Sequence, residues 1–321
     1  MTDRKTDNKI FLLSICVFLI LGGTLAGYAA KTADDAPPKR KVSVIVSDST
    51  NDKWSTLFAG LRDGAKEHNI SLSLVSTNAF TSVDDEAFYV DREIKSGAQA
   101  IILETFTSPG ATQLAEVISH RVPTLAIGNP PSGDDIPSYH YRNHDMGVSI
   151  LKRIRKDFRG KDHLKIGILC EDEDSEEAKR RLKGFTEELP DSWEVTWTIR
   201  SSHQAVGALA SNQHINPADI IVAMDSSSLD YAIDYKLEKP DDDIVLYGIG
   251  NSEKSAYYLD KGVITAMAVP NAFDMGYLSL CAVAGNMSDH KPMENHEIDY
   301  VVVDQETMYD ESYQKILFPL N

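Results

Sequence analysis

Short apolar runs alternate with longer helical patterns along this chain, and the whole series occurs twice. The first series begins with "KVSVIVS" at Lys41 and continues into an amphipathic segment that contains Leu57, Leu61 and Ala65. The second series begins with "LKIGILC" at residues 164–170. Alternation of this kind is typical of βαβ units that build a parallel sheet. The sequence therefore predicts two similar α/β lobes, with a ligand bound in the crevice at the carboxyl ends of their strands.

Composition and motifs argue against two classes of function. The 321 residues are 42% hydrophobic and 25% charged, which suits two compact lobes. The formal net charge of −17 argues against a nucleic-acid partner, because phosphate binding needs clustered Lys and Arg. "GIGNSEK" at residues 248–254 lacks the third Gly of a dinucleotide fingerprint, and the chain has no G-x-S-x-G, H-E-x-x-H or Walker motif. We therefore expect a protein that is not an enzyme and that needs no cofactor.

The N-terminus predicts a membrane segment. Residues 1–9 carry three positive charges, and residues 10–30 form an uncharged apolar run of 21 residues. At ~1.5 Å per residue this run spans roughly 30 Å, the thickness of a bilayer core. The positive flank predicts that residues 1–9 are cytoplasmic, so the folded part is expected to lie outside the cell membrane, tethered by one transmembrane helix.

A cleavable signal peptide is the alternative for this segment. The densest apolar part, Phe11 to Leu21, has the length of a signal-peptide core, and "GYA" supplies small residues for cleavage. Cleavage would make the protein secreted. Residues 31–40, which contain Pro37 and Pro38, are predicted to be a polar linker.

The three cysteines are not expected to be reactive. Cys16 lies in the apolar run, whereas Cys170 ends a predicted strand and Cys281 lies in a predicted helix. Cys170 and Cys281 are interpreted as buried, inert thiols, and a bridge between them is left open.

Two polar clusters are interpreted as structural. In "HYRNHD" the spacing between His140 and His144 does not place them on one face of a strand or loop, so surface or hinge residues are favoured over a metal site. The acidic residues 171–177 are interpreted as a solvated loop whose carboxylates favour the positive end of the following helix, rather than a cation site.

Trp54 is the most unusual residue of the first lobe. It follows the first strand on a polar loop, beside Asn51, Asp52 and Lys53. An exposed indole at this place offers a flat face on which a sugar ring can stack, and the polar neighbours can bind hydroxyl groups. The alternative is that Trp54 lies flat on its own lobe.

From about Lys41 to the end, the sequence resembles the type I periplasmic sugar-binding proteins, in particular the ribose-binding group, which share their fold with the ligand-binding part of lac-repressor-type regulators. The DNA-reading helix-turn-helix of those regulators is missing, and the apolar segment stands in its place. The resemblance is carried by the order and spacing of "NDKW", "GLRDGAKE", "IKSGAQAIIL", "VPTLAIGN", "RNHDMG", "RRLKGF" and "NAFDMGY".

This resemblance implies two Rossmann-like lobes with parallel sheets, joined by a three-strand hinge that closes on one sugar. The chain is expected to cross between the lobes near Arg142, Pro270 and Tyr300. The lobes are then expected to comprise residues 41–141 plus about 271–298, and residues 142–270 plus about 299–321.

The resemblance also implies the ligand site, with several departures. Gly128 and Asn129 stand where the family often has an Asp-Arg pair, Lys179 replaces an Arg, and Asp225 replaces an Asn. Because these departures, together with Gly250 and Pro270, remove charge-assisted hydrogen bonds to a ribose-like ligand, ribose itself is not expected. The predicted ligand-binding residues are Asn51, Lys53, Trp54, Thr107, Ser108, Asn129, Asn143, Lys179, Arg181, Asp225 and Asn251.

Two functions follow from the resemblance. In the first, the protein captures a small saccharide for an ABC-type importer and delivers it to the permease. In the second, a membrane-tethered sensor closes on the sugar and passes that change to a histidine kinase or another membrane receptor. A third interpretation is a degenerate pair of lobes that binds only protein.

Overall fold

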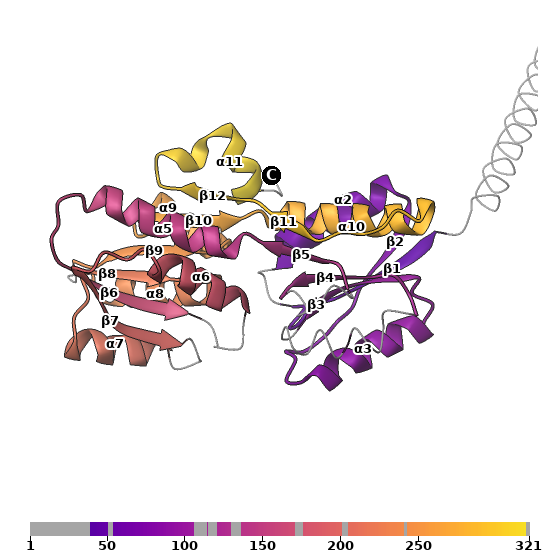
Figure 1. Cartoon of the computed structure of the whole chain (residues 1–321), viewed down its shortest axis with the longest axis horizontal. Coiled ribbons are helices and arrows are strands. Elements are labelled where there is room, and N and C mark those ends of the chain that lie inside the picture. The colour runs from indigo at the N-terminus through magenta and orange to yellow at the C-terminus, as the bar shows by residue number, and fades with distance from the viewer. Residues whose placement is uncertain are drawn as a thin grey trace, which may run out of the picture. The chain divides into compact units, whose positions relative to one another are not determined.

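The computed structural model describes residues 39–50, 54–105, 114, 121–129, 136–170, 176–200, 205–240 and 243–318 (Figure 1). Residues 40–321 form one compact unit. The predicted cytoplasmic end, the predicted membrane segment at residues 10–30 and nearly all of the predicted linker lie outside the described residues. Among the described residues, none of the helices has both the length and the hydropathy of a membrane span.

The first lobe is built on a six-stranded sheet in the order β11-β5-β4-β3-β1-β2, and all of its strand pairs are parallel. Helices α2 and α10 cover one face of this sheet, and α3 covers the other (Figure 1). The strands are β1 (Arg40–Ile45), β2 (Ile70–Leu74), β3 (Ala100–Thr105), β4 (Thr124–Gly128), β5 (Ser138–Tyr141) and β11 (His296–Ile298). The helices are α2 (Ser55–Glu67), α3 (Val83–Lys95) and α10 (Ala272–Asp289).

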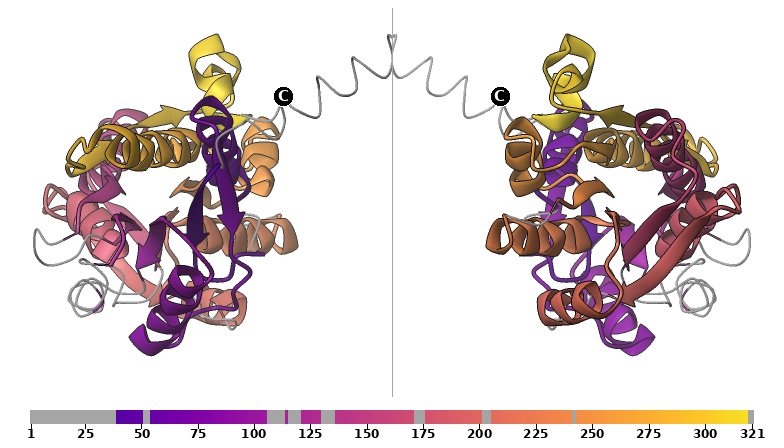
Figure 2. Two further views of the ribbon diagram at one scale, coloured as in Figure 1. Left: turned by 90° about the vertical axis from the view of Figure 1, so that its right-hand side faces the viewer. Right: turned by 90° about the vertical axis from the view of Figure 1, so that its left-hand side faces the viewer.

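The second lobe repeats this plan in the order β12-β10-β9-β8-β6-β7. Its strands are β6 (Leu164–Cys170), β7 (Trp193–Arg200), β8 (Ile220–Ala223), β9 (Val245–Ile249), β10 (Ala266–Pro270) and β12 (Tyr300–Val303). Two helices pack on one face of the sheet, α5 (Asn143–Asp157) and α6 (Glu176–Thr186). The other face carries α7 (Ala205–Ile215), α8 (Ser226–Glu238), α9 (Glu253–Asp260), η2 (Thr307–Tyr309) and α11 (Glu311–Leu317). The end views place α11 on the side of the molecule opposite to α3 (Figure 2).

The segment "EIDYVVVD" forms two strands, one in each lobe. Strand β11 joins the first sheet and β12 joins the second, with Asp299 between them. Because the chain changes sheets there, β12 runs antiparallel to β10, which makes the second sheet mixed rather than wholly parallel.

The three passages between the lobes lie side by side. The chain leaves β5 through Arg142 to enter α5, and it leaves β10 through Asn271 to enter α10. Backbone N–H groups of these two residues donate to the carbonyl oxygens of Ile298 (3.2 Å) and Asp299 (3.1 Å), in the third passage. The first and second passages are therefore each bonded to the third.

Each lobe contains a helix pair in close contact through glycine. A Cβ atom added at Gly60 of α2 would collide with the carbonyl oxygen of Phe273 in α10, and one added at Gly147 of α5 would collide with that of Arg181 in α6. Glycine lets the two backbones approach to this distance because it has no Cβ. The second helix of each pair contributes its own glycine, Gly276 or Gly184, to the same crossing.

The two described cysteines are free thiols. Cys170 is buried at the end of β6 and Cys281 lies half-buried in α10, so they belong to different lobes. The bridge that the sequence left open does not form.

Candidate ligand-binding site

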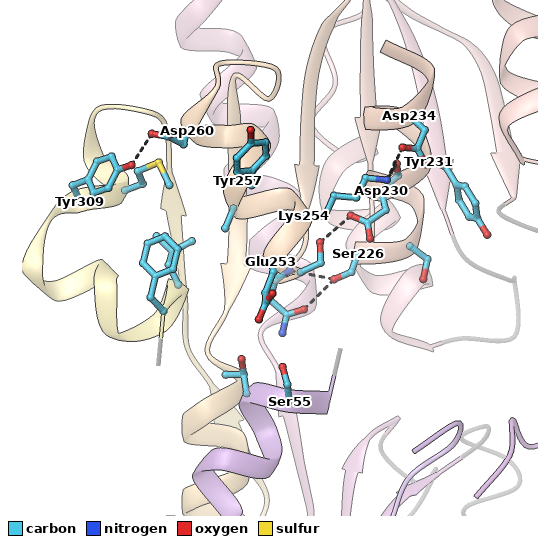
Figure 3. Close-up of a pocket in the computed structure, with 18 of the residues that line it drawn as sticks. Ser55, Ser226, Asp230, Tyr231, Asp234, Glu253, Lys254, Tyr257, Asp260 and Tyr309 are labelled. Carbon is cyan, nitrogen blue, oxygen red and sulfur yellow. Dashed lines mark hydrogen bonds and ion pairs between the residues drawn. The ribbon is translucent and has the colours of Figure 1, made fainter. Parts of the chain in front are cut away.

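The carboxyl ends of strands from both sheets contribute to one cleft. Thr50 and Ser55 follow β1 in the first lobe, whereas Ser226 follows β8 and Asn251 follows β9 in the second. All four line a cavity of about 1070 Å³ (Figure 3). In α/β folds, ligands bind at this end of the strands.

The second-lobe wall of the cavity begins with a serine and an asparagine. The Ser226 hydroxyl donates to Asn251 Oδ1 at 3.0 Å and accepts from the Asn251 backbone N–H at 3.2 Å. Asn251, a predicted site residue, therefore lies in the cavity wall, and Ser226 was missed by the sequence reasoning although it directly follows the predicted Asp225. Both side chains can also bond to ligand hydroxyl groups.

Acidic and aromatic side chains extend this wall toward the C-terminal segment. Lys254 Nζ donates to Asp234 Oδ1 at 2.6 Å, and the Ser252 hydroxyl donates to Asp230 Oδ1 at 2.8 Å (Figure 3). Burial raises the pKa of Asp230, which the Ser252 bond and Lys254 partly oppose. The aromatic residues of this wall are Tyr231, Tyr257, Tyr309 and Phe318.

Asp225 serves the fold of the second lobe. Its side chain is 3% exposed and caps the start of α8, with one oxygen accepting from the Ser228 backbone N–H (2.8 Å) and the other from the Ser228 hydroxyl (2.7 Å). An aspartate at this position satisfies a helix N–H group that would otherwise be unpaired. This predicted ligand residue therefore has a structural role.

Trp54 lies at the start of α2 and contacts its own lobe. Its indole Nε1 donates to the carbonyl oxygen of Ser47 at 3.0 Å, and its half-buried ring packs against the core of the first lobe. Among the described residues, Ser55 and Thr56 line the cavity in its place. This arrangement favours the packing alternative, whereas stacking on a sugar stays a prediction. Its neighbours Asn51 and Lys53 lie outside the described residues.

Asn143 and Arg181 form a buried network in the second lobe. Arg181 Nε donates to Asn143 Oδ1 at 2.7 Å, and Arg181 Nη1 donates to the carbonyl oxygen of Met224 at 3.1 Å. Asn143 Nδ2 donates to Glu177 Oε1 at 3.3 Å. Asn143 and Arg181 are 3% and 7% exposed, so these bonds fix the starts of α5 and α6 against the end of β8. Glu177, which belongs to the acidic run, was not predicted as part of the site.

Asn129 connects the two lobes. Its side-chain Nδ2 donates to the carbonyl oxygen of Thr105 in the first lobe at 3.2 Å. Its Oδ1 accepts from the backbone N–H groups of Glu176 (3.1 Å) and Glu177 (3.4 Å) at the start of α6 in the second lobe. Lys179, one turn further along α6, is exposed. The predicted residues Thr107 and Ser108 lie outside the described residues.

Tyr141 and His140 belong to β5, and His144 lies in the first turn of α5. Burial raises the pKa of Tyr141, and the carboxylate of Glu177 adds to the rise, so the phenol stays neutral. Burial likewise lowers the pKa of His140. His144 on α5 lies 2.5 Å from Glu187, and no group of three or more potential metal ligands occurs within the described residues.

Comparison with known proteins identifies this architecture. A family model described as a periplasmic binding protein domain matches residues 42–289. The structure is similar to a carbohydrate transporter solute-binding protein from Agrobacterium radiobacter in complex with D-arabinose, with a TM-score of 0.80 and 17% identity over 88% of this chain and 100% of that one. No curated protein matches the sequence significantly.

Two further structures share the fold. The myo-inositol-binding protein of Caulobacter has a TM-score of 0.77 and 12% identity, covering 87% of this chain and 98% of that one. A chain of the XylFII-LytSN complex has a TM-score of 0.72 and 16% identity, covering 84% of this chain and 99% of that one.

Proposed function

The chain belongs to the periplasmic binding protein domain family, and on this premise we propose that it is an extracytoplasmic protein that closes on a small, neutral saccharide. Members of this family bind solutes and are not enzymes. The proposed role is therefore reversible capture of a ligand between two lobes, with closure about the three passages at Arg142, Asn271 and Asp299.

The hydroxyl and amide side chains at the cleft carry this proposal. Thr50, Ser55, Ser226 and Asn251 come from three strand ends and two lobes, and they line one cavity. Each offers both donors and acceptors, which is what a polyhydroxy ligand requires. Proteins of the same fold were solved with D-arabinose and with myo-inositol, which supports a ligand of this class.

The first process in which this protein is proposed to take part is import through an ABC permease. Solute-binding proteins of transporters are among the structures that share the fold. Purification from native membranes after crosslinking should then recover a permease with its ATPase.

A tethered sensor is the second candidate. It is favoured by the apolar run at residues 10–30 and by the similarity to a chain of the XylFII-LytSN complex. In that case the crosslinked partner should be a membrane receptor, and the N-terminus should be intact in purified membranes.

Thermal unfolding of the full chain in detergent, with a panel of pentoses, hexoses and inositols, tests the binding proposal. A sugar present at a hundred times its Kd should stabilise the folded protein by ~2.7 kcal/mol, because it binds only the folded state. An absence of stabilisation across the panel would contradict saccharide binding and favour a pair of lobes that binds only protein.

A further inference from the structure

We propose that Asn129 is a latch between the lobes, which stabilises their closed arrangement through bonds that the chain makes with itself. The ligand-affinity part of this inference rests on the proposed function, whereas the closure part does not. In this role Asn129 acts on the binding site by positioning the two lobes that form it.

Asn129 is fixed firmly on the first lobe. Its Nδ2 donates to the Thr105 carbonyl oxygen, and the Thr105 hydroxyl donates back to the Asn129 carbonyl oxygen. Thr105 ends β3 and is 1% exposed, so the asparagine is held at the ends of two neighbouring buried strands. With its Nδ2 held in this way, the amide oxygen Oδ1 is directed to the second lobe.

On the second lobe, Asn129 bonds to the first turn of α6. The N–H groups at a helix start have no partner within the helix, and they form the positive end of its dipole. Asn129 Oδ1 accepts from two of them, those of Glu176 and Glu177. Asparagine is a preferred helix-capping residue, and here it comes from a different lobe.

The latch continues into the buried network of the second lobe. The Glu177 carboxylate accepts from Asn143 and lies 3.6 Å from Arg181 Nη2, and Arg181 donates to the Met224 carbonyl oxygen. The hydrogen bonds therefore run without interruption from the end of β3 in the first lobe to the end of β8 in the second. Opening of the lobes must break the two bonds of Asn129, whereas the rest of the network stays within one lobe.

Removing the latch should shift the balance between closed and open forms. A net hydrogen bond of the usual strength corresponds to a roughly three- to tenfold change in an equilibrium constant. Asn129→Ala should lower the closed-to-open ratio by that factor. Because only the closed form holds the ligand fully, the affinity for the saccharide should fall by up to the same factor.

The α6 side of the latch can be removed separately. Glu176→Pro deletes the nearer of the two N–H groups from which Asn129 Oδ1 accepts, at a first helical position where proline is well tolerated. Glu176→Ala keeps this N–H group and removes only a half-buried carboxylate that pairs with Arg180. Asn212→Ala is the matched control for asparagine, since Asn212 bonds a backbone carbonyl within a single lobe.

The test measures the distance between two spin labels, one on each lobe. The labels are placed at the exposed residues Arg62 in α2 and Lys183 in α6. The full chain is used without sugar, and its native cysteines are replaced. The short-distance population should shrink about three- to tenfold in Asn129→Ala and in Glu176→Pro, and it should be unchanged in Glu176→Ala and Asn212→Ala. Equal distance distributions in all five proteins would overturn the latch. A shift with no saccharide binding in any protein would keep the latch and remove the proposed function instead.

Discussion

The two lobes share one kind of helix crossing, but the residues at the cleft ends of their helices differ. In the first lobe, α2 crosses α10 at Gly60, and in the second, α5 crosses α6 at Gly147. The cleft end of α2 carries Trp54, packed on its own lobe, whereas the cleft ends of α5 and α6 carry a buried Asn143–Arg181 network. The lobes therefore share their helix packing and differ in the polar and aromatic side chains at these helix starts.

The largest effect is expected when the glycine at either helix crossing is replaced. Gly60→Ala and Gly147→Ala each place a methyl group against a backbone carbonyl oxygen of the partner helix. Both variants should lose at least about 3 kcal/mol of unfolding free energy in denaturant titrations, because neither backbone can move aside without separating the helices. Gly207→Ala on α7 is the control, since an added Cβ there meets nothing within 4 Å, and it should be neutral or slightly stabilising. If only one of the two glycine variants lost stability, the helix crossings of the two lobes would not be equivalent.

Arg181→Met tests the edge of the second lobe. The change leaves Asn143 Oδ1 and the Met224 carbonyl oxygen without their buried donor, and it should cost about 2–4 kcal/mol of unfolding free energy. Arg181→Lys should not restore stability, because an ammonium group lacks the planar fork that reaches both acceptors. Lys179→Met, on the exposed face of the same helix, should change stability by less than about 0.5 kcal/mol. If Arg181→Met and Lys179→Met lost similar amounts of unfolding free energy, the buried network would not be a particular source of stability.

Trp54→Ala tests the edge of the first lobe. If the indole stacks on the sugar, binding should weaken by roughly 1–3 kcal/mol, and the change in tryptophan fluorescence on binding should disappear. Trp193→Phe is the control, because Trp193 is buried in the second lobe. Unchanged affinity in Trp54→Ala would assign Trp54 to packing alone, as its bond to Ser47 suggests.

The smallest expected effect concerns pH. Burial raises the pKa of Asp304, but hydrogen bonds from Thr307 and Arg153 outweigh it and lower the pKa to about 2. Because the folded pKa lies below the ordinary value of 3.8, the contribution is complete above about pH 4 and is lost as the pH falls toward 2. Asp304→Asn should therefore remove about 1 kcal/mol at pH 7 and much less near pH 2, measured by thermal unfolding. An equal loss at both pH values would contradict this ion pair.

The sequence predicts the lobes better than it predicts the site. Alternating apolar runs suffice for two α/β lobes, because each run must bury itself in a sheet. The same pattern cannot show that the chain changes sheets at Asp299, since a strand has the same period in either sheet. Residue type likewise did not show that Asp225 caps a helix or that Arg181 is buried, because both roles depend on neighbours distant in sequence. A glycine inside a helical pattern, as in "RNHDMG", was an available signal of close helix contact.

Isothermal titration calorimetry of the full chain in detergent, with the most stabilising sugar of the thermal panel, measures whether the cleft binds one saccharide. The two lobes around one cleft predict saturable binding of one saccharide per chain, with a negative heat-capacity change as the lobes close. Absence of saturable heat with every neutral saccharide would show that the two lobes do not bind this class of ligand.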